Sequence, residues 1–306
     1  MFLGEQDLLH QSKINFQLQR LYPDGNHLVN PLIQVEGPPG GDARLESARR
    51  KLDSYIKDRL KNLDASSISV YLRDMETGRW VGIHEDKKYI AASLAKVPLM
   101  FSFFLKAQRD PEILKKEIRY ETEIHEDKQQ FIPPKNRPQV GASYTVETLL
   151  RNMIVYSDNI SMYLLGNDID RELVGHLYAD LGLPLPLKGS EYRISAKDYA
   201  RYFRLLYSAI YLNKDSSEQA LKLLIQSDFH DGIVAGVPQN LLVAHKFAER
   251  ERGVDGVQLH DCGIVYYPNR PYLICVMTEG QKLDTLKEII QNISRIIYEN
   301  QNFNSL

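Results

Sequence analysis

Apolar residues recur at three- and four-residue steps near both ends of this chain. Over residues 43–60 and again over residues 283–297 they form one continuous stripe, which predicts an amphipathic helix in each place. Residues 67–72 and 80–83 are predicted to be strands joined by a turn. Further strands are expected later in the chain, over residues 241–247, 259–265 and 272–277.

The middle of the chain is predicted to be mainly helical. Helices are expected over residues 146–155, 160–165, 171–181 and 196–209, and Ser195 is well placed to cap the last of them. The order helix, strands, helical block, strands, helix predicts an α+β fold. In that fold an antiparallel sheet is flanked by the N- and C-terminal helices, and an all-helical lobe lies beside it. A site would lie between the sheet and the lobe.

Domain boundaries follow from the same pattern. Residues 1–42 are polar and end in a turn-rich Gly/Pro stretch, so they are predicted to be an extension or linker. One domain is expected over residues 43–306, with an α/β lobe (43–91 and 238–306) and a helical lobe (92–237). The chain has no apolar run of about 18 residues and its first five residues lack signal-peptide features. It is therefore either cytoplasmic or preceded by a targeting segment or membrane anchor, with residues 1–42 as the spacer.

Composition narrows the class of protein. The 306 residues carry a formal net charge of -2, which argues against a nucleic-acid partner. The two cysteines, Cys262 and Cys275, lack metal-ligand spacing, so a structural zinc site is not expected. No cofactor and no other metal is predicted either. Both cysteines fall in the hairpin of residues 259–277. If the turn centres on Asn269 and Arg270, the cysteines are diagonal neighbours, too far apart for a disulfide. They are predicted to be buried free thiols.

The first candidate for chemistry is Ser93-Leu94-Ala95-Lys96. On a helix, residues three apart share a face, so the Lys96 amine can reach the Ser93 hydroxyl. A buried lysine with a lowered pKa can act as the base that a serine nucleophile needs. By chance alone, S-x-x-K occurs about once in a chain of this length. Pro98 is expected to distort the first turns of the helix.

Two further polar motifs follow along the chain. Ser157-Asp158-Asn159 stands between two predicted helices, where it could simply cap the second. Alternatively, Ser157 relays a proton and Asn159 binds a substrate amide. His245-Lys246-Phe247 ends a predicted strand, where it could be no more than a strand edge that meets solvent.

Taken in order, S-x-x-K, S-D-N and K-x-x resemble the motif set of class A β-lactamases and penicillin-binding proteins. The resemblance covers roughly residue 43 to the C-terminus. It implies that Ser93 is acylated, that Lys96 is its base and that Ser157 relays the proton. It also implies that Lys246 supplies positive charge, and that Asn159 and residue 247 contact substrate. The backbone N–H groups of Ser93 and Glu249 would form the oxyanion hole.

The chain departs from this pattern at two points. The third motif is Lys246-Phe247-Ala248 where the family has Lys-Thr/Ser-Gly, so a hydroxyl that helps to hold the substrate carboxylate is missing. The long loop with a deacylating glutamate is also missing. Glu191 is the nearest carboxylate in sequence order and therefore the candidate for the deacylation base. The favoured interpretation is that it is a solvated loop residue.

These features predict a serine hydrolase that forms an acyl-Ser93 intermediate with a β-lactam, amide or ester. Its chemistry would be of the β-lactamase or DD-peptidase type, with slow deacylation. The expected partner is a small-molecule or peptidoglycan-like substrate, and the resemblance implies a location in the cell envelope. Two alternatives stay open: a catalytically silent binding domain on the same scaffold, and an S-x-x-K amidase similar to glutaminases.

Overall fold

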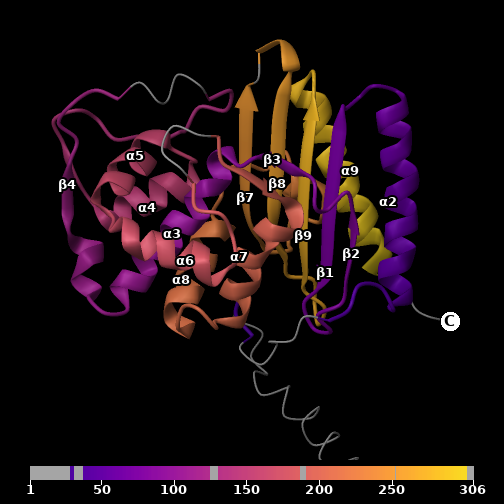
Figure 1. Ribbon diagram of the computed structural model, residues 1–306, viewed down its shortest axis with the longest axis horizontal. Helices are drawn as coiled ribbons and strands as arrows, with labels where there is room; N and C mark the ends of the chain where they lie inside the picture. The colour runs from indigo at the N-terminus through magenta and orange to yellow at the C-terminus, as the bar shows by residue number, and fades with distance from the viewer. Residues whose placement is uncertain (1–27, 31–36, 125–129, 187–190, 252, 302–306) are drawn as a thin grey trace, which may run out of the picture.

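The computed structural model describes residues 28–30, 37–124, 130–186, 191–251 and 253–301. Its centre is a five-stranded antiparallel sheet with strand order β2-β1-β9-β8-β7, and helices cover both faces (Figure 1). The strands are β1 (Ser67–Asp74), β2 (Trp80–Ile83), β7 (Val243–Glu251), β8 (Val257–Val265) and β9 (Tyr272–Gly280). The predicted α+β architecture is confirmed.

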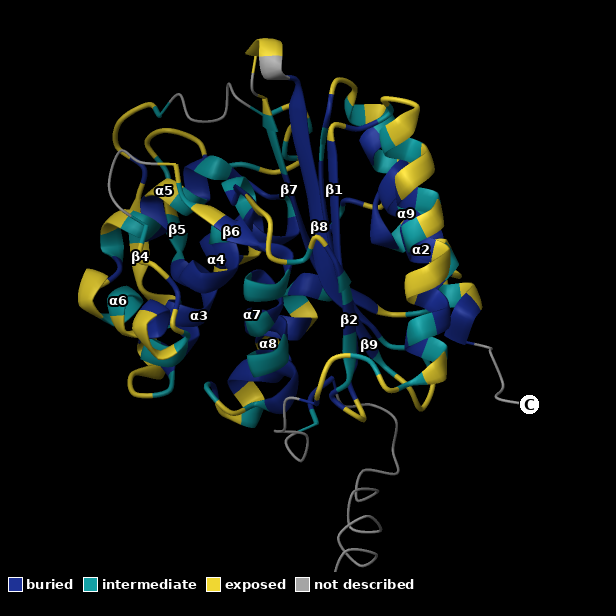
Figure 2. Cartoon of the chain, turned by 45° about the vertical axis from the view of Figure 1, so that its right-hand side comes forward, coloured by how far each residue is buried: buried dark blue, intermediate teal, exposed yellow. Residues whose placement is uncertain are grey.

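Two long helices cover one face of the sheet. They are α2 (Ala43–Lys61) and α9 (Leu283–Gln301), which lie side by side at one edge of Figure 1. The Asp42 carboxylate caps α2 by accepting the N–H groups of Arg44 and Leu45. Both helices bury an apolar stripe against the strands and turn polar residues outward, as the burial colours show (Figure 2). The predicted terminal helices are therefore correct.

The helical lobe packs on the opposite face and forms a second hydrophobic cluster. Its helices are η1 (Ala92–Ala95), α3 (Lys96–Ala107), η2 (Pro111–Lys115), α4 (Val146–Val155), α5 (Asn159–Asp168), α6 (Arg171–Asp180), α7 (Ala196–Ser208) and α8 (Lys214–Ile225). Of two further short 3₁₀ helices, η4 (Ile233–Gly236) precedes β7 and packs against α9, and η5 (Gly253–Asp255) lies between β7 and β8. Ser195 caps α7 by accepting the Asp198 N–H, as predicted.

Short elements are what the sequence pattern missed. The helix α8 was not predicted, nor were two small antiparallel pairs. These pairs are β3 (Lys88–Ile90) with β6 (Arg193–Ser195), and β4 (Glu117–Arg119) with β5 (Ser143–Thr145). Three residues are too few to show a recognisable alternation of apolar and polar positions. The strands that pair with them also lie far away in sequence, so no hairpin signal marks them.

The prediction of free thiols is wrong. Cys262 and Cys275 form a disulfide, and both residues are fully buried. The β8–β9 register pairs Val265 with Tyr272, so the two cysteines stand directly opposite each other. The predicted turn centre was displaced by one residue, which was enough to convert an opposed pair into a diagonal one.

Part of the N-terminal extension belongs to the folded body. Leu28 and Val29 are buried in the cluster of the helical lobe, and their N–H groups donate to the Glu218 carboxylate. The Leu28 carbonyl accepts the Tyr266 hydroxyl at 3.0 Å. Residues 1–27 and 31–36 of the predicted extension lie outside the described residues. None of the helices in the described ranges combines the length and the apolar composition that crossing a bilayer requires.

Candidate active site

Ser93 stands on a sharp turn that leads from β3 into the helical lobe. Both backbone groups of Ile90 are tied to β8, the N–H to Gln258 Oε1 at 3.2 Å and the C=O to His260 Nε2 at 3.2 Å. Ala92 then takes a left-handed backbone conformation with φ of 45°, which is strained for a residue with a Cβ atom. This turn places Ser93 at the start of η1, where the first backbone N–H groups lack helical acceptors.

Pro98 disturbs this helix less than the sequence suggested. The chain begins as the 3₁₀ turn η1 and continues as α3 from Lys96, so Pro98 is the third residue of the α-helix. In the first turn a proline gives up an N–H that would have no helical acceptor. The motif therefore keeps its helical spacing.

Lys96 lies at the centre of the site and is fully buried. Its amine is 2.8 Å from Ser93 Oγ, 2.7 Å from Asn159 Oδ1 and 2.6 Å from the Ser157 carbonyl oxygen. It is also 3.1 Å from Ser157 Oγ. A charged ammonium has three N–H donors for these four oxygens, whereas a neutral amine has two donors and a lone pair. In the neutral form the lone pair can accept the Ser93 hydroxyl proton, while the two N–H groups donate to oxygens of Asn159 and Ser157.

Ser157 joins the first motif to the third. It takes a left-handed conformation, with φ of 56°, between the end of α4 and Asp158, which caps α5 by accepting the Ser161 N–H. Its Oγ accepts a hydrogen bond from Lys246 at 2.9 Å. With both lone pairs facing lysine amines, the Ser157 hydroxyl keeps its own proton available for donation. The capping interpretation of S-D-N is thus also correct, for Asp158.

Burial controls the charge of both lysines. Desolvation, followed by the neighbouring Lys246 ammonium, lowers the pKa of Lys96 well below its ordinary value. Desolvation lowers the pKa of Lys246 to about 7, against the opposing influence of the Asp261, Asp228 and Glu249 carboxylates. Because the two amines are buried close together, the pair binds fewer than two protons at neutral pH. One of the two amines is then neutral and can act as a base.

The free edge of β7 turns backbone groups toward Ser93. The Cα atoms of Cys262 and Cys275 are 3.9 Å apart, the spacing of a pair that exchanges no hydrogen bonds. The backbone of Cys262 therefore faces β7, where its partner is Lys246. By alternation, the N–H and C=O groups of Phe247 and Glu249 point away from β8. The Phe247 carbonyl indeed accepts the Lys246 ammonium at 2.9 Å.

The Phe247 side chain does not line the site. Its ring is 1% exposed and stacks on Phe229 with 4.2 Å between ring centroids. The Lys246 amine lies 4.3 Å from the same ring. Side chains alternate along a strand, so the ring faces the α2–α9 layer while Lys246 faces the helical lobe. The predicted substrate contact of Phe247 is therefore corrected: this side chain belongs to the core.

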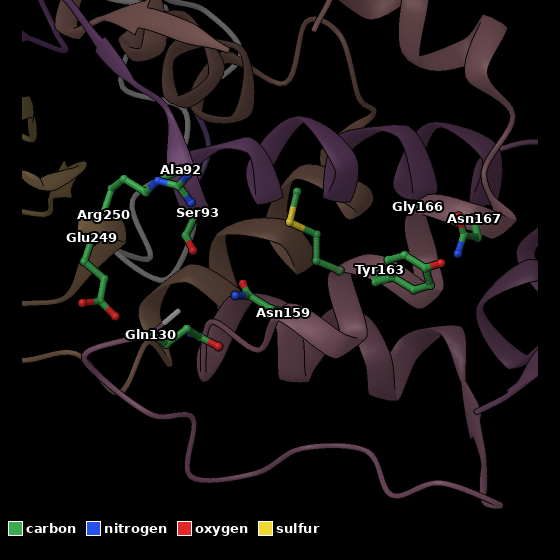
Figure 3. Close-up of a pocket in the computed structure, with 10 residues that line it drawn as sticks. Ala92, Ser93, Gln130, Asn159, Tyr163, Gly166, Asn167, Glu249 and Arg250 are labelled. Carbon is green, nitrogen blue, oxygen red and sulfur yellow. The ribbon is translucent and has the colours of Figure 1, made fainter. Parts of the chain in front are cut away.

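A cleft of about 350 Å³ opens in front of Ser93 (Figure 3). It is lined by Ala92, Ser93, Gln130, Asn159, Met162, Tyr163, Gly166, Asn167, Glu249 and Arg250. Gln130 was not among the predicted site residues, and its Nε2 donates to the Ser157 carbonyl at 3.0 Å. No local signal could have placed this residue at the site, because it lies 27 residues before Ser157. The Glu249 carboxylate accepts the Ile132 N–H at 2.8 Å and so ties the same loop to β7.

Glu191 lies beside the site rather than in it. Its side chain is 51% exposed and forms ion pairs with Arg193 at 3.4 Å and Arg250 at 3.9 Å. It lines a second cavity, which adjoins the cleft because Ala92 and Arg250 line both. The solvated interpretation therefore describes Glu191 better than that of a deacylation base. Within the described residues no cluster of metal-ligating side chains is present.

Comparisons with known proteins place this geometry in context. The family model described as "Beta-lactamase enzyme family" matches residues 51–301. No curated protein is detectably similar to the chain in sequence. The fold is similar to that of PBP-A in a mutant solved as an acyl-enzyme complex with penicillin G. That match has a TM-score of 0.70 and 18% identity, over 87% of this chain and 98% of that one.

Class A β-lactamases show the same architecture. The enzyme from Mycobacterium abscessus matches with a TM-score of 0.69 and 20% identity, over 84% of this chain and 100% of that one. The enzyme from Bacteroides cellulosilyticus matches with a TM-score of 0.71 and 16% identity, over 86% of this chain and 99% of that one. At these identities of 16 to 20% the structural likeness shows the fold alone.

Proposed function

Since this chain belongs to the beta-lactamase enzyme family of serine hydrolases, we propose that Ser93 is acylated by a β-lactam, amide or ester carbonyl. The observation that carries this proposal is the 2.8 Å contact between the Ser93 hydroxyl and the buried Lys96 amine. A hydroxyl becomes an effective nucleophile only when a base takes its proton, and burial prepares Lys96 for that role.

The acylation step uses the groups gathered at the cleft. Ser93 Oγ bonds to the carbonyl carbon while its proton passes to the neutral Lys96 amine. The N–H groups of Ser93 and Glu249 stabilise the oxyanion. As the carbon–nitrogen bond breaks, the Ser157 hydroxyl protonates the leaving nitrogen, and Lys96 returns a proton to Ser157 across their 3.1 Å contact.

Deacylation is expected to be slow. Hydrolysis of the acyl-enzyme needs a base that activates water, and residues 182–194 contain a single carboxylate, Glu191. That side chain is half exposed and paired with arginines. The Glu249 carboxylate is bound to the Ile132 N–H. These contacts support an enzyme in which the acyl-Ser93 intermediate is hydrolysed more slowly than it is formed.

The buried disulfide supports a location outside the reducing cytoplasm. The family relationship favours the same location, and it favours a substrate that resembles peptidoglycan or its β-lactam mimics. Lys246 lies deep in the site, where its charge can attract an acidic group. An arrangement with neither the Thr/Ser hydroxyl at position 247 nor a deacylating loop favours a penicillin-binding over an antibiotic-destroying activity.

The test is covalent labelling with a fluorescent penicillin, followed by intact-mass measurement. We expect one adduct per chain, its loss in S93A, and its retention in S66A, which removes an exposed serine outside the site. Rapid turnover of nitrocefin without an adduct would contradict slow deacylation. No labelling by β-lactam, ester or thioester probes would instead indicate a catalytically silent binding domain, and ammonia release from glutamine would indicate the amidase.

A further inference from the structure

A buried carboxylate lies behind the strand that carries Lys246. Asp261 is on β8, directly opposite Phe247 of the neighbouring strand β7 (Figure 1), and its side chain has no exposed surface. One carboxylate oxygen accepts a hydrogen bond from His245 Nδ1 at 2.8 Å, and the other accepts the Ile233 N–H at 2.9 Å. His245 and Phe247 precede and follow Lys246 in sequence. Asp261 therefore engages the residue on each side of Lys246.

The loop around Asp261 keeps this carboxylate in place. A Cβ atom added at Gly232 would clash with Asp261 Oδ2, so the glycine lets the loop backbone come close enough for the next N–H to donate. Phe229, from the same loop, stacks on Phe247. A carboxylate is tolerated in the interior when its oxygens are hydrogen-bonded. Both oxygens of Asp261 meet this condition, so the group can remain an anion inside the fold.

The charge of Lys246 depends on the carboxylates around it. Desolvation lowers its pKa, and of the carboxylates that oppose this effect Asp261 acts most strongly, ahead of Asp228 and Glu249. Asp228 is already paired with the Lys135 ammonium at 3.4 Å. Asp261 and Lys246 are both fully buried, where charges are screened much less than at the surface. Asp261 is therefore the main source of negative potential at this lysine.

Lys96 competes with Lys246 for a proton. Desolvation, followed by the Lys246 ammonium, lowers the pKa of Lys96, and the carboxylates that act most against this are Asp158 and Glu249. Glu249 acts on both lysines, so it does not discriminate between them. Asp261 acts chiefly on one of the two. A carboxylate with this selectivity decides which amine of a coupled pair holds the proton.

We propose that Asp261 is a positioning residue that keeps the proton of the lysine pair on Lys246 and leaves Lys96 as the neutral base. Through Lys246 it also determines a preference for substrates with a carboxylate on the leaving-group side, which Ser157 marks. The inference rests on the proposed function, because the preference is expressed only if Ser93 is acylated. It assigns specificity to a residue on the face of the sheet that is turned away from the cleft.

The test compares two thioesters of N-acetyl-glycine whose leaving thiol is either thioglycolic acid or the isosteric thioglycolamide. Acylation joins the glycyl carbonyl carbon to Ser93 Oγ and breaks the carbon–sulfur bond, and the serine proton ends on the released thiol. Dithiodipyridine measures that thiol. At pH 6, below the pKa of about 7 of Lys246, we expect the second-order acylation constant to be at least about tenfold higher for the carboxylate.

The variant D261N should bring this ratio down to about one. Asparagine keeps the shape of the side chain, and its amide can still accept the Ile233 N–H and donate to the other tautomer of His245. The constant for the carboxamide should fall as well, because part of Lys96 then carries the proton. D74N is the matched control, since Asp74 is a buried aspartate at the end of β1, and it should keep the ratio.

NMR reads the charges of the lysines independently of acylation. At pH 6 the ¹³Cε signal that is absent in K246M should have the position of an ammonium, and the signal absent in K96M that of an amine. D261N should move the Lys246 signal to the amine position. The reverse assignment in the unchanged protein, which requires no variant of Asp261 to fold, would overturn the proposal.

Three further results would also overturn it: an unmoved Lys246 signal in D261N, a retained substrate ratio in D261N, or a ratio near one in the unchanged protein. If neither thioester acylates Ser93, the proposed function fails. The NMR signals of the two lysines still decide the role of Asp261 in that case.

Discussion

The amines of Lys96 and Lys246 converge on one hydroxyl oxygen, Ser157 Oγ, at 3.1 and 2.9 Å. Both lysines are fully buried, and neither forms an ion pair among the contacts described. Two ammonium groups held this close destabilise each other, so the pair releases a proton more easily than a lone surface lysine does. This relationship links the S-x-x-K serine to the strand β7.

The first prediction concerns this coupling. Replacing Lys246 with methionine removes the neighbouring cation, so the pKa of Lys96 should rise and its neutral form should become scarcer at pH 7. The ascending limb of the pH profile for Ser93 acylation should move to higher pH. At pH 7 the rate should fall by about 10²-fold or more. A K246R variant, which keeps a charge, should leave the limb near its original place; an unmoved limb in K246M would refute the coupling.

The second prediction concerns Glu191. Its carboxylate is half exposed, pairs with two arginines and lines a cavity other than the cleft. E191Q should therefore change the rate at which the penicilloyl adduct disappears by less than about twofold, since exposed ion pairs contribute little. The rate is followed by intact mass after removal of excess drug. A tenfold slowing would restore Glu191 as the deacylation base.

The third prediction concerns the buried disulfide. Reduction should lower the free energy of unfolding by about 3 kcal/mol, because a loop with a sequence separation of 13 is no longer closed in the unfolded chain. Urea unfolding with and without dithiothreitol measures this difference. The double variant C262A/C275A should show no response to the reductant. Thiol titration of the denatured, unreduced protein should detect no thiol; two reactive thiols would show that the bond is absent.

The fourth prediction concerns His260, which holds the strand that leads to Ser93. Burial lowers its pKa from 6.5 to about 4, so the ring is neutral in the folded protein. Between pH 6.5 and pH 4 the unfolded chain binds a proton that the folded one does not, and stability falls as the pH falls. From pH 7 to pH 5 the loss due to this group is about 2 kcal/mol. Below pH 4 both states are protonated and the contribution is constant.

The control for this effect is H260Q, which retains hydrogen-bonding capacity but cannot titrate. Its free energy of unfolding should fall by about 2 kcal/mol less than that of the unchanged protein between pH 7 and pH 5. Chemical unfolding at the two pH values gives both differences. Equal losses in the two proteins would mean that His260 is already protonated in the fold, or exposed.

The sequence determined the elements whose information is local. The stripes of α2 and α9 have a helical period over many residues, and Ser195 could be recognised as a cap because the helix it begins follows at once. The contact between Ser93 and Lys96 belongs to this class as well. Residues three apart on a helix meet whatever the rest of the chain does.

Tertiary structure decided what depends on register and on distant partners. A displacement of one residue in the centre of the β8–β9 turn makes the difference between the predicted diagonal pair of free thiols and the directly opposed disulfide of Cys262 and Cys275. Strand alternation sent the Phe247 ring into the core and left Lys246 at the site. Lys246 reaches Ser157 across 89 residues, and Gln130 reaches it from a loop. No local pattern encodes such meetings, because they exist only once the sheet and the helical lobe have packed together.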